Sequence, residues 1–246
     1  MITKYIKEKI KILLFKFNFK LQKIYVQKEY NFETPPLKLI EKMRESKGIF
    51  HIGAHRGGEA PIYEWFGKKV IWVEANPKIF IDLLINIKPF KFQQAICALL
   101  TNKDNEKRKF FISNNDSASS SIYKLGSLSE GNKSLWKNKN IKMINEMSLV
   151  SKKLDTIIRE SEIDMKNYDH WVIDVQGAEM EVLEGSKQNL KFCNSLFIEV
   201  SKGEVYLKGS QWNEVKNFLM GFNLIPINEI QSEHENVLFV RKINRN

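Results

Sequence analysis

From residue 37 onward, short apolar strands alternate with amphipathic helices, and this alternation limits the possible folds more than any other feature. An apolar stretch at 48–52 precedes a helical pattern at 59–66, and a second stretch at 69–73 precedes a second helical pattern at 78–87. Strands that alternate with helices form parallel sheets covered by helices on both faces. The pattern therefore predicts an α/β fold with a mostly parallel, doubly wound sheet.

The same alternation continues toward the C-terminal end. Further strands are expected at 92–97, 109–113, 171–174 and 196–200, and further helices at 37–46, 154–161, 180–190 and 212–221. The last two strands, 223–226 and 237–241, follow each other without a helix, which predicts an antiparallel hairpin at one edge of the sheet. Residues 114–150 are rich in serine, asparagine and lysine, and we expect a long loop with short helical pieces there.

The first thirty residues carry most of the net positive charge. Eight lysines against two glutamates give this segment +6, out of +10 for the whole chain. Apolar residues recur at helical spacing from Ile6 to Ile24, which predicts a basic amphipathic helix. Such a helix either binds an anionic membrane surface or packs on its own domain, and both interpretations stay open. The proline pair at 35–36 ends it, so we expect an N-terminal helical segment over 1–36 and a larger domain over 37–246.

Composition excludes several other classes of protein. Apolar residues make up 43% of the chain and charged residues 28%, as in ordinary globular domains. No apolar run approaches the ~20 residues of a membrane span, and lysines interrupt the one candidate signal peptide. Cys97 and Cys193 lack the spacing of a metal or redox site, and we expect two free, buried thiols. These features indicate a cytoplasmic protein, at most peripheral on the inner membrane face through residues 1–30.

Glycines and carboxylates gather where the predicted strands end, which is the edge at which such sheets bind ligands. Gly53 and Gly57 follow the first strand and let the backbone approach a ligand closely. Glu74 ends the next strand, 21 residues after Gly53, and a carboxylate at about this interval can accept the hydroxyls of a ribose. The sequence therefore predicts a pocket for an adenosine-type ligand.

The residue at 55 favours one such ligand over another. A dinucleotide turn needs Gly-x-Gly-x-x-Gly to bind a pyrophosphate, but here His55 stands at the second glycine position. S-adenosylmethionine has no phosphate, so this loss affects it less. Asp174 ends a later strand and can serve the amino-acid end or the sulfonium of that cofactor.

Several motifs together resemble the FkbM family of S-adenosylmethionine-dependent methyltransferases. They are His51–Gly58, Trp72–Pro77, Leu154–Thr156, and Ile173–Glu179 with Val182–Gly185. The similarity covers roughly residues 48–226, and it implies a Rossmann-like class I methyltransferase that methylates a hydroxyl of a sugar, a glycan or a secondary metabolite.

Three positions depart from the usual pattern of that family. It has Asp at the place of His51, Asn at that of His55 and Glu at that of Gln176. A subgroup with His-Ile-Gly-Ala-His, Gln-Gly-Ala-Glu and a serine run, here 119–121, is similar throughout. The departures therefore indicate a coherent variant, although no role is carried over for the missing acid at 51.

The site residues follow from these motifs. We expect the cofactor to be bound by residues at the strand ends and turns: His51, Gly53, Ala54, His55, Gly57, Glu74, Ala75, Ala95 and Asp174. A sugar hydroxyl needs a base before it can attack, and the candidates are Asp174, Glu199 and His55. A divalent cation held by Asp174 and Glu199 is an alternative to a base, but two carboxylates are too few and no metal is predicted.

Other polar residues near these motifs are less specific. Glu179 is either a site residue or an acid that favours the start of its helix. We expect His170 and His234 to be surface or structural residues.

An oxidoreductase and a non-catalytic binding module are the two alternative function classes. A nicotinamide-dependent sugar oxidoreductase is disfavoured by His55 and by the lack of a Tyr-x-x-x-Lys pair within residues 37–246. A non-catalytic module would bind a membrane or RNA through the basic N-terminal segment. The turn after 171–174 reads Asp-Val-Gln-Gly, without the proline and aromatic residue of enzymes that methylate nucleic-acid bases. The expected acceptor is therefore a hydroxyl of a sugar or glycan, and no nucleic acid is expected as a partner.

Overall fold

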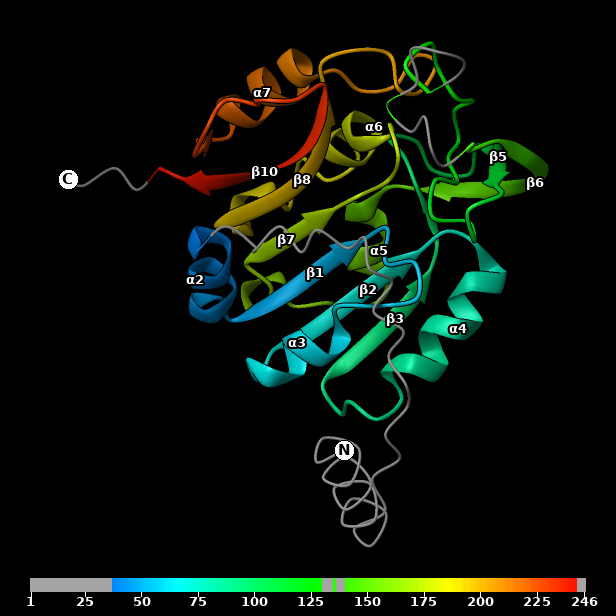
Figure 1. Cartoon of the computed structure of the whole chain (residues 1–246). Helices are drawn as coiled ribbons and strands as arrows, with labels where there is room; N and C mark the ends of the chain where they lie inside the picture. Colours follow the sequence, from blue (N-terminus) through cyan, green and yellow to red (C-terminus); the bar gives the residue numbers. More distant parts are fainter. Residues whose placement is uncertain (1–36, 130–134, 136–139, 243–246) are drawn as a thin grey trace, which may run out of the picture. The chain divides into compact units, whose positions relative to one another are not determined.

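The computed structural model describes residues 37–129, 135 and 140–242 (Figure 1). The amphipathic helix predicted over 1–36 lies outside the described residues, so its boundary and its membrane contact stay predictions. None of the helices in the described part of the chain has the length and apolar character needed to span a bilayer.

A seven-stranded sheet forms the centre of the domain (Figure 1). Its strands lie in the order β3 (Gln93–Cys97), β2 (Lys69–Glu74), β1 (Gly48–Ile52), β7 (His170–Ile173), β8 (Ser195–Ser201), β10 (His234–Arg241) and β9 (Leu224–Pro226). The first five are parallel, and β10 runs antiparallel to both β8 and β9. This topology confirms the predicted α/β fold with a mostly parallel sheet and an antiparallel C-terminal edge.

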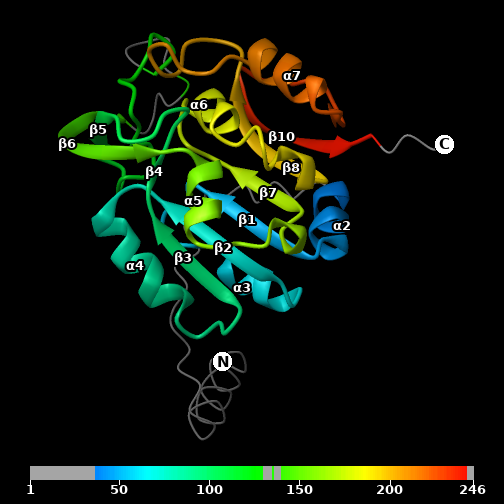
Figure 2. The ribbon, with the colours of Figure 1, turned by 180° about the vertical axis from the view of Figure 1, so that it is seen from behind.

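Helices cover both faces of this sheet (Figures 1 and 2). Buried apolar residues of α2 (Leu37–Glu45), α3 (Ala60–Trp65) and α4 (Pro77–Ile87) contribute to one apolar cluster, and those of α5 (Leu154–Glu160), α6 (Glu179–Glu184) and α7 (Trp212–Gly221) contribute to another. Strand β1 serves both clusters, because Ile49 packs on the first side and Phe50 on the second. The carboxyl ends of the parallel strands therefore remain open between two covered faces.

A small second sheet stands beside that edge. It has the order β4 (Leu99–Leu100), β6 (Met143–Lys152) and β5 (Lys107–Ser113), with β5 antiparallel to β6. Our expectation of a loop throughout 114–150 is wrong for β6. Its apolar signal is weak because Met147 and Leu149 pack inward while the residues between and around them are exposed.

Two smaller expectations also differ from the structure. The helix expected over 180–190 ends at Glu184, because Gly185 passes so close to another segment that a Cβ there would lie 2.2 Å from the carbonyl oxygen of Thr101. Cys193 is buried, but Cys97 is exposed because it is the last residue of the edge strand β3.

Candidate active site

The turn after β1 crosses the end of β7 in direct backbone contact. Gly53 has φ +84°, and a Cβ at this position would lie 1.7 Å from the carbonyl oxygen of Asp174. The amides of Gly53 and Ala54 both donate to the carbonyl of Val73, at 2.9 and 3.0 Å. Glycine is therefore required at 53, and the turn is held between the ends of β2 and β7.

Glu74 ends β2 with a nearly buried carboxylate. One oxygen accepts the amide of His55 at 2.8 Å, and the other accepts the amide of Asn76 at 2.7 Å. Burial raises the pKa of Glu74, although these two hydrogen bonds oppose the shift. The two oxygens together offer about four lone pairs, so the carboxylate can still accept a hydroxyl group of a ligand.

A cavity of about 560 Å³, its open mouth included, lies over this edge of the sheet. Five predicted site residues line it, namely Gly53, His55, Glu74, Ala75 and Asp174. The sequence did not single out the opposite wall, which is mainly apolar and comes from Ala98, Leu99, Leu100, Phe110 and Ile122. An apolar wall facing one buried carboxylate fits an adenine ring joined to a ribose.

The other predicted cofactor residues do not line the cavity. Ala54 and Gly57 belong to the same turn, and Gly57 has φ +67°. The ring of His51 is buried on the side of α3, where it stacks on Trp72 with centroids 4.7 Å apart and its Nδ1 lies 3.1 Å from the hydroxyl of Tyr63. Ala95 packs into the apolar cluster of α2–α4.

His55 connects the first turn to the serine-rich loop that follows β5. Its Nε2 donates to the carbonyl oxygen of Asp116 at 2.8 Å. The adjacent Arg56 guanidinium binds both carboxylate oxygens of Asp116 and, through Nε at 2.9 Å, the carboxylate of Asp82. These contacts hold the loop beside the cavity, which Ala118 and Ser120 also line.

The serine run at 119–121 is buried. Ser121 Oγ donates to the carbonyl oxygen of Gln176 at 2.6 Å, and the carbonyl oxygen of Ser119 accepts the hydroxyl of Tyr206 at 3.3 Å. These hydrogen bonds hold the serine run against the turn after β7 and against Tyr206.

Asp174 and Glu199 come together through the side chain of Gln176. The amide nitrogen of Gln176 donates to Asp174 Oδ1 and, at 2.8 Å, to Glu199 Oε2. Its carbonyl oxygen accepts the hydroxyl of Tyr206 at 2.5 Å. One donor and two acceptors therefore set the orientation of the Gln176 amide. Asp174 lines the cavity, whereas Glu199 lies behind the cavity wall.

His234 belongs to this network, although we expected it to be a surface or structural residue. Its Nε2 lies 3.0 Å from Glu199 Oε1, and its Nδ1 lies 2.9 Å from Ser201 Oγ. His234 stands opposite Ser201 in the β8–β10 ladder. The signal that would have found it is the pairing of β10 with β8, since alternation along β8 brings Glu199 to the same side as Ser201.

Crowding of carboxylates shifts the proton affinities at this site. Burial, and then the charge of Glu199, raise the pKa of Asp174 well above its usual range. The same two causes raise the pKa of Glu179 to about 7, and its Oε1 accepts the amide of Gly177 at 3.0 Å. Burial is the largest single effect on His234 and lowers its pKa, but the hydrogen bond with Glu199 and the charges of Glu199 and Glu179 together outweigh it, so the pKa is raised.

This arrangement can bind hydroxyl groups and accept a proton from one of them. Asp174 offers a carboxylate with raised proton affinity at the cavity wall, which suits a general base. In the part of the chain that the structure describes, no three or more histidine, cysteine or acidic side chains are grouped so as to hold a metal ion.

Solved structures with similar folds share little sequence with this chain. Fibrillarin from Aeropyrum pernix with natively bound S-adenosyl-L-methionine is 12% identical, with TM-score 0.45 over 82% of this chain and 72% of that one. The fibrillarin pre-rRNA processing protein of Methanococcus jannaschii is 13% identical, with TM-score 0.47 and coverages of 81% and 68%. Magnesium protoporphyrin IX methyltransferase from Synechocystis with bound S-adenosylmethionine is 7% identical, with TM-score 0.44 and coverages of 83% and 74%.

The sequence comparison is more direct. No curated protein sequence matches the chain. The model of the methyltransferase FkbM domain matches residues 51–228, a range that includes every predicted site residue from His51 to Glu199. The match confirms the predicted enzyme class and cofactor, and the chain belongs to the FkbM family of S-adenosylmethionine-dependent methyltransferases.

Proposed function

We propose that this enzyme methylates a hydroxyl group of a sugar or glycan. The observation that carries the proposal is the Asp174–Gln176–Glu199 network, of which Asp174 and Gln176 line the cavity. A carboxylate and an amide side by side are suited to hydrogen-bond the neighbouring hydroxyls of a sugar. The turn that contains Asp174 and Gln176 presents no aromatic ring on which a nucleic-acid base would stack.

Different residues of the cavity would bind different parts of the cofactor. Glu74 would hold the ribose hydroxyls, and the apolar wall that includes Leu99 and Phe110 would cover the adenine. When bound, S-adenosylmethionine supplies an electrophilic methyl group on a sulfonium. Enzymes of this kind gain most of their rate by holding the acceptor oxygen close to the reacting carbon and in line with it.

Asp174 is the base in this proposal. The acceptor hydroxyl loses its proton to the carboxylate of Asp174 as its oxygen becomes bonded to the methyl group. Glu199 lies behind the wall and is held by His234, and the Nε2 of His55 is occupied by the carbonyl of Asp116. Asp174 is therefore the candidate base best placed to meet an acceptor. We also propose that the reaction takes place in the cytoplasm, in keeping with the free thiols Cys97 and Cys193.

The test is a binding measurement followed by a transfer assay. Calorimetry should show binding of S-adenosylmethionine and none of a nicotinamide dinucleotide. Methyl-labelled cofactor is then incubated with panels of oligosaccharides, nucleic acids, proteins and amino sugars, with Asp174→Asn as the inactive control. Label that stays on a sugar through alkaline hydrolysis identifies a methyl ether, as proposed. Transfer to an amine, a carboxylate or a nucleic-acid base would overturn the proposed acceptor.

A further inference from the structure

Helix α4 is apolar on its outer face as well as its inner one. Ile79, Leu83 and Ile87 are buried against the sheet. On the opposite side, Ile81, Leu84 and Ile85 are 59%, 43% and 64% exposed. Polar side chains occupy only one flank of α4, where Asp82 and Asn86 contact Arg56. Apolar side chains on the outer face of a surface helix indicate contact with something beyond this domain.

The neighbouring surface shares this character. Of the twelve large apolar side chains exposed in the described part of the chain, six lie between residues 62 and 92. They are Ile62 and Trp65 on α3, the three outer residues of α4, and Phe92 just before β3. Trp65 is 87% exposed, more than any of the others. Helices α3 and α4 both contact β2 and bury their inner faces in the same apolar cluster, so they lie on the same side of the sheet. We call these six exposed side chains the α3–α4 patch.

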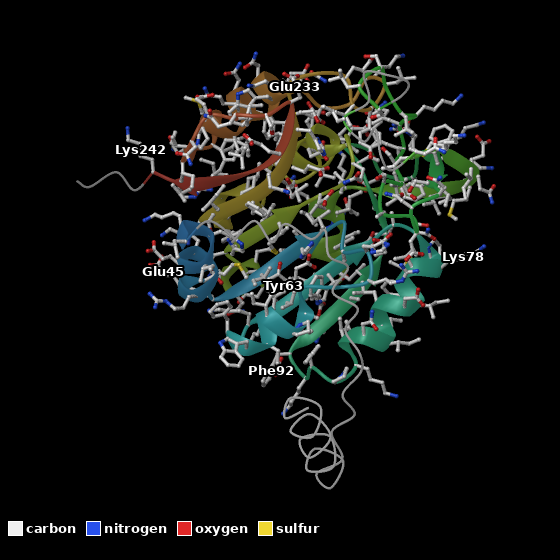
Figure 3. All side chains as sticks on the ribbon, in the orientation of Figure 1. Glu45, Tyr63, Lys78, Phe92, Glu233 and Lys242 are labelled. Carbon is white, nitrogen blue, oxygen red and sulfur yellow. The ribbon has the colours of Figure 1, made fainter. Side chains whose placement is uncertain are left out.

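Lysines surround one end of the α3–α4 patch. Lys69, Lys88 and Lys91 are exposed where α3 and α4 end and β2 and β3 begin. The ammonium of Lys91 lies 5.4 Å from the centre of the Phe92 ring, and the carbonyl of Phe92 accepts the amide of Val70 beside the start of β2. Figure 3 shows Phe92 at this lower end of the ribbon and Lys78 at the other end of α4.

Acidic groups offset this local charge only in part. Asp82 on α4 is paired with Arg56 at 2.9 Å, and the remaining exposed acids of α3 and its N-terminal cap are Glu64 and Glu59. Exposed tryptophan and phenylalanine beside lysines are typical of surfaces that enter the headgroup region of a bilayer. Protein–protein interfaces, in contrast, are depleted in lysine.

We propose that the α3–α4 patch docks on the surface of an anionic membrane. The aromatic and aliphatic side chains enter the headgroup region, and the three lysines contact anionic lipids. Stable attachment of a peripheral protein generally takes two signals, and residues 1–30, with +6 and an apolar stripe, supply a second one in the sequence. The patch differs from that segment because it belongs to the catalytic domain.

This docking leaves the active site accessible. Trp65, Phe92 and the lysines lie at the amino ends of the parallel strands, and the cavity lies over their carboxyl ends. A domain held by the α3–α4 patch would therefore direct its cavity mouth away from the lipid. The proposal does not depend on which hydroxyl is methylated.

The first experiment uses the full chain and vesicles of phosphatidylcholine with or without phosphatidylglycerol. A triple variant, Trp65→Ser with Ile85→Ser and Phe92→Ser, changes the patch, and Ile144→Ser with Val150→Ser changes exposed apolar residues of β6 as a matched control. The triple variant should lose at least about tenfold in partitioning to the anionic vesicles, because three large apolar side chains no longer enter the bilayer. The control pair should bind as the parent chain does, and cofactor affinity should remain unchanged in both.

The second experiment follows the indole of Trp65 directly. Brominated lipid should quench tryptophan emission in the parent chain and in Trp212→Phe, but much less in Trp65→Phe. Equal quenching in the two variants, together with unchanged partitioning of the triple variant, would refute the proposal. Two further results would also overturn it. One is loss of a dimer in the triple variant with unchanged vesicle binding, which would assign the patch to a second copy. The other is shielding of Trp65 from acrylamide without vesicles, which would assign it to the chain's own N-terminal segment.

Discussion

His234 donates from Nε2 to Glu199 Oε1 over 3.0 Å and so joins the last strand of the sheet to the carboxylates beside the cavity. The contact is diagonal, because His234 stands opposite Ser201 and Glu199 stands opposite Asn236 in the ladder. An imidazolium at this position balances part of the charge that Glu199 and Asp174 would otherwise place on each other.

Replacing His234 by Gln should shift the pH dependence of methyl transfer. The variant retains a donor near Glu199 but loses the positive charge beside the carboxylates, so the pKa of Asp174, which the charge of Glu199 already raises, should rise further. The acid limb of kcat/KM should therefore move to higher pH by about one unit. The measurement is a pH–rate profile, and His234 is a positioning residue in this prediction.

The control for that variant is Ser201→Ala, which removes the partner of Nδ1 but leaves the charge in place. It should leave the acid limb within a few tenths of a unit of the parent. An unchanged profile in His234→Gln, with lower activity at every pH, would indicate a purely structural role for His234.

Asp174→Asn should abolish most turnover and leave cofactor binding nearly intact. The amide fills the same space but cannot take a proton, so kcat should fall by about 10²-fold or more. Single-turnover assays with saturating cofactor give the rate, and calorimetry gives the affinity. A large loss of affinity would instead identify Asp174 as an anchor for the cofactor.

Gln176→Glu should destabilise the protein in a pH-dependent way. The new side chain would be a carboxylate next to Asp174 and Glu199, in a place where an amide now donates to both. Repulsion at pH 8 should lower the free energy of unfolding by about 2 kcal/mol, and protonation at pH 5 should restore most of it. Denaturant unfolding at the two pH values measures the difference. A loss that is equal at both values would point to altered packing and not to charge.

Glu179→Gln should raise the free energy of unfolding, whereas Gln176→Glu lowers it. Its pKa is raised to about 7 in the folded protein from the ordinary value of 4.5, so the folded state binds the proton more tightly than the unfolded state does. The cost of ionising it is therefore absent below about pH 4.5 and grows as the pH rises toward 7. Removing the charge should stabilise the protein by on the order of 2–3 kcal/mol more at pH 8 than at pH 4.5. The exposed Glu59→Gln serves as control and should show no such difference.

Glu74→Gln should weaken binding of S-adenosylmethionine at least about tenfold, because charge-assisted hydrogen bonds to the ribose contribute roughly 1.5–3 kcal/mol each. The amide also replaces an acceptor by a donor next to the backbone amides of His55 and Asn76, so a modest fall in thermal stability is expected. Calorimetry on folded protein separates the two effects. Affinity equal to that of the parent chain would refute the ribose role of Glu74.

The sheet was predictable because its strands are short apolar runs between clear turn signals. Strand β1 has the predicted bounds, and β2 and β7 differ from theirs by one residue at one or both ends. Strand β6 was missed because one of its sides faces solvent, so it lacks a continuous apolar run. Helix α6 ends early because of a tertiary contact at Gly185 that no local pattern reveals.

Sequence reasoning found the parts of the site that lie at strand ends. Gly53, Glu74 and Asp174 were predicted to meet at one edge, and all three line the same cavity. The apolar wall around Phe110 was not predicted, because its position depends on where the second sheet packs. The contact of His234 with Glu199 was not predicted for a similar reason. The two residues are 35 positions apart in the sequence and meet only through the pairing of β10 with β8.

The cavity has walls from two different sheets, and this division bears on how such an enzyme can evolve. The turns at Gly53 and Asp174 touch backbone to backbone, so neither can change length without displacing the other. Phe110, Ser120 and Ile122 instead belong to the hairpin of β5 and β6 and its loop. Over evolution, substitutions in that hairpin can therefore reshape the apolar wall over the adenine while the lengths of the two turns stay fixed. An insertion or deletion in either turn would disturb both turns at once.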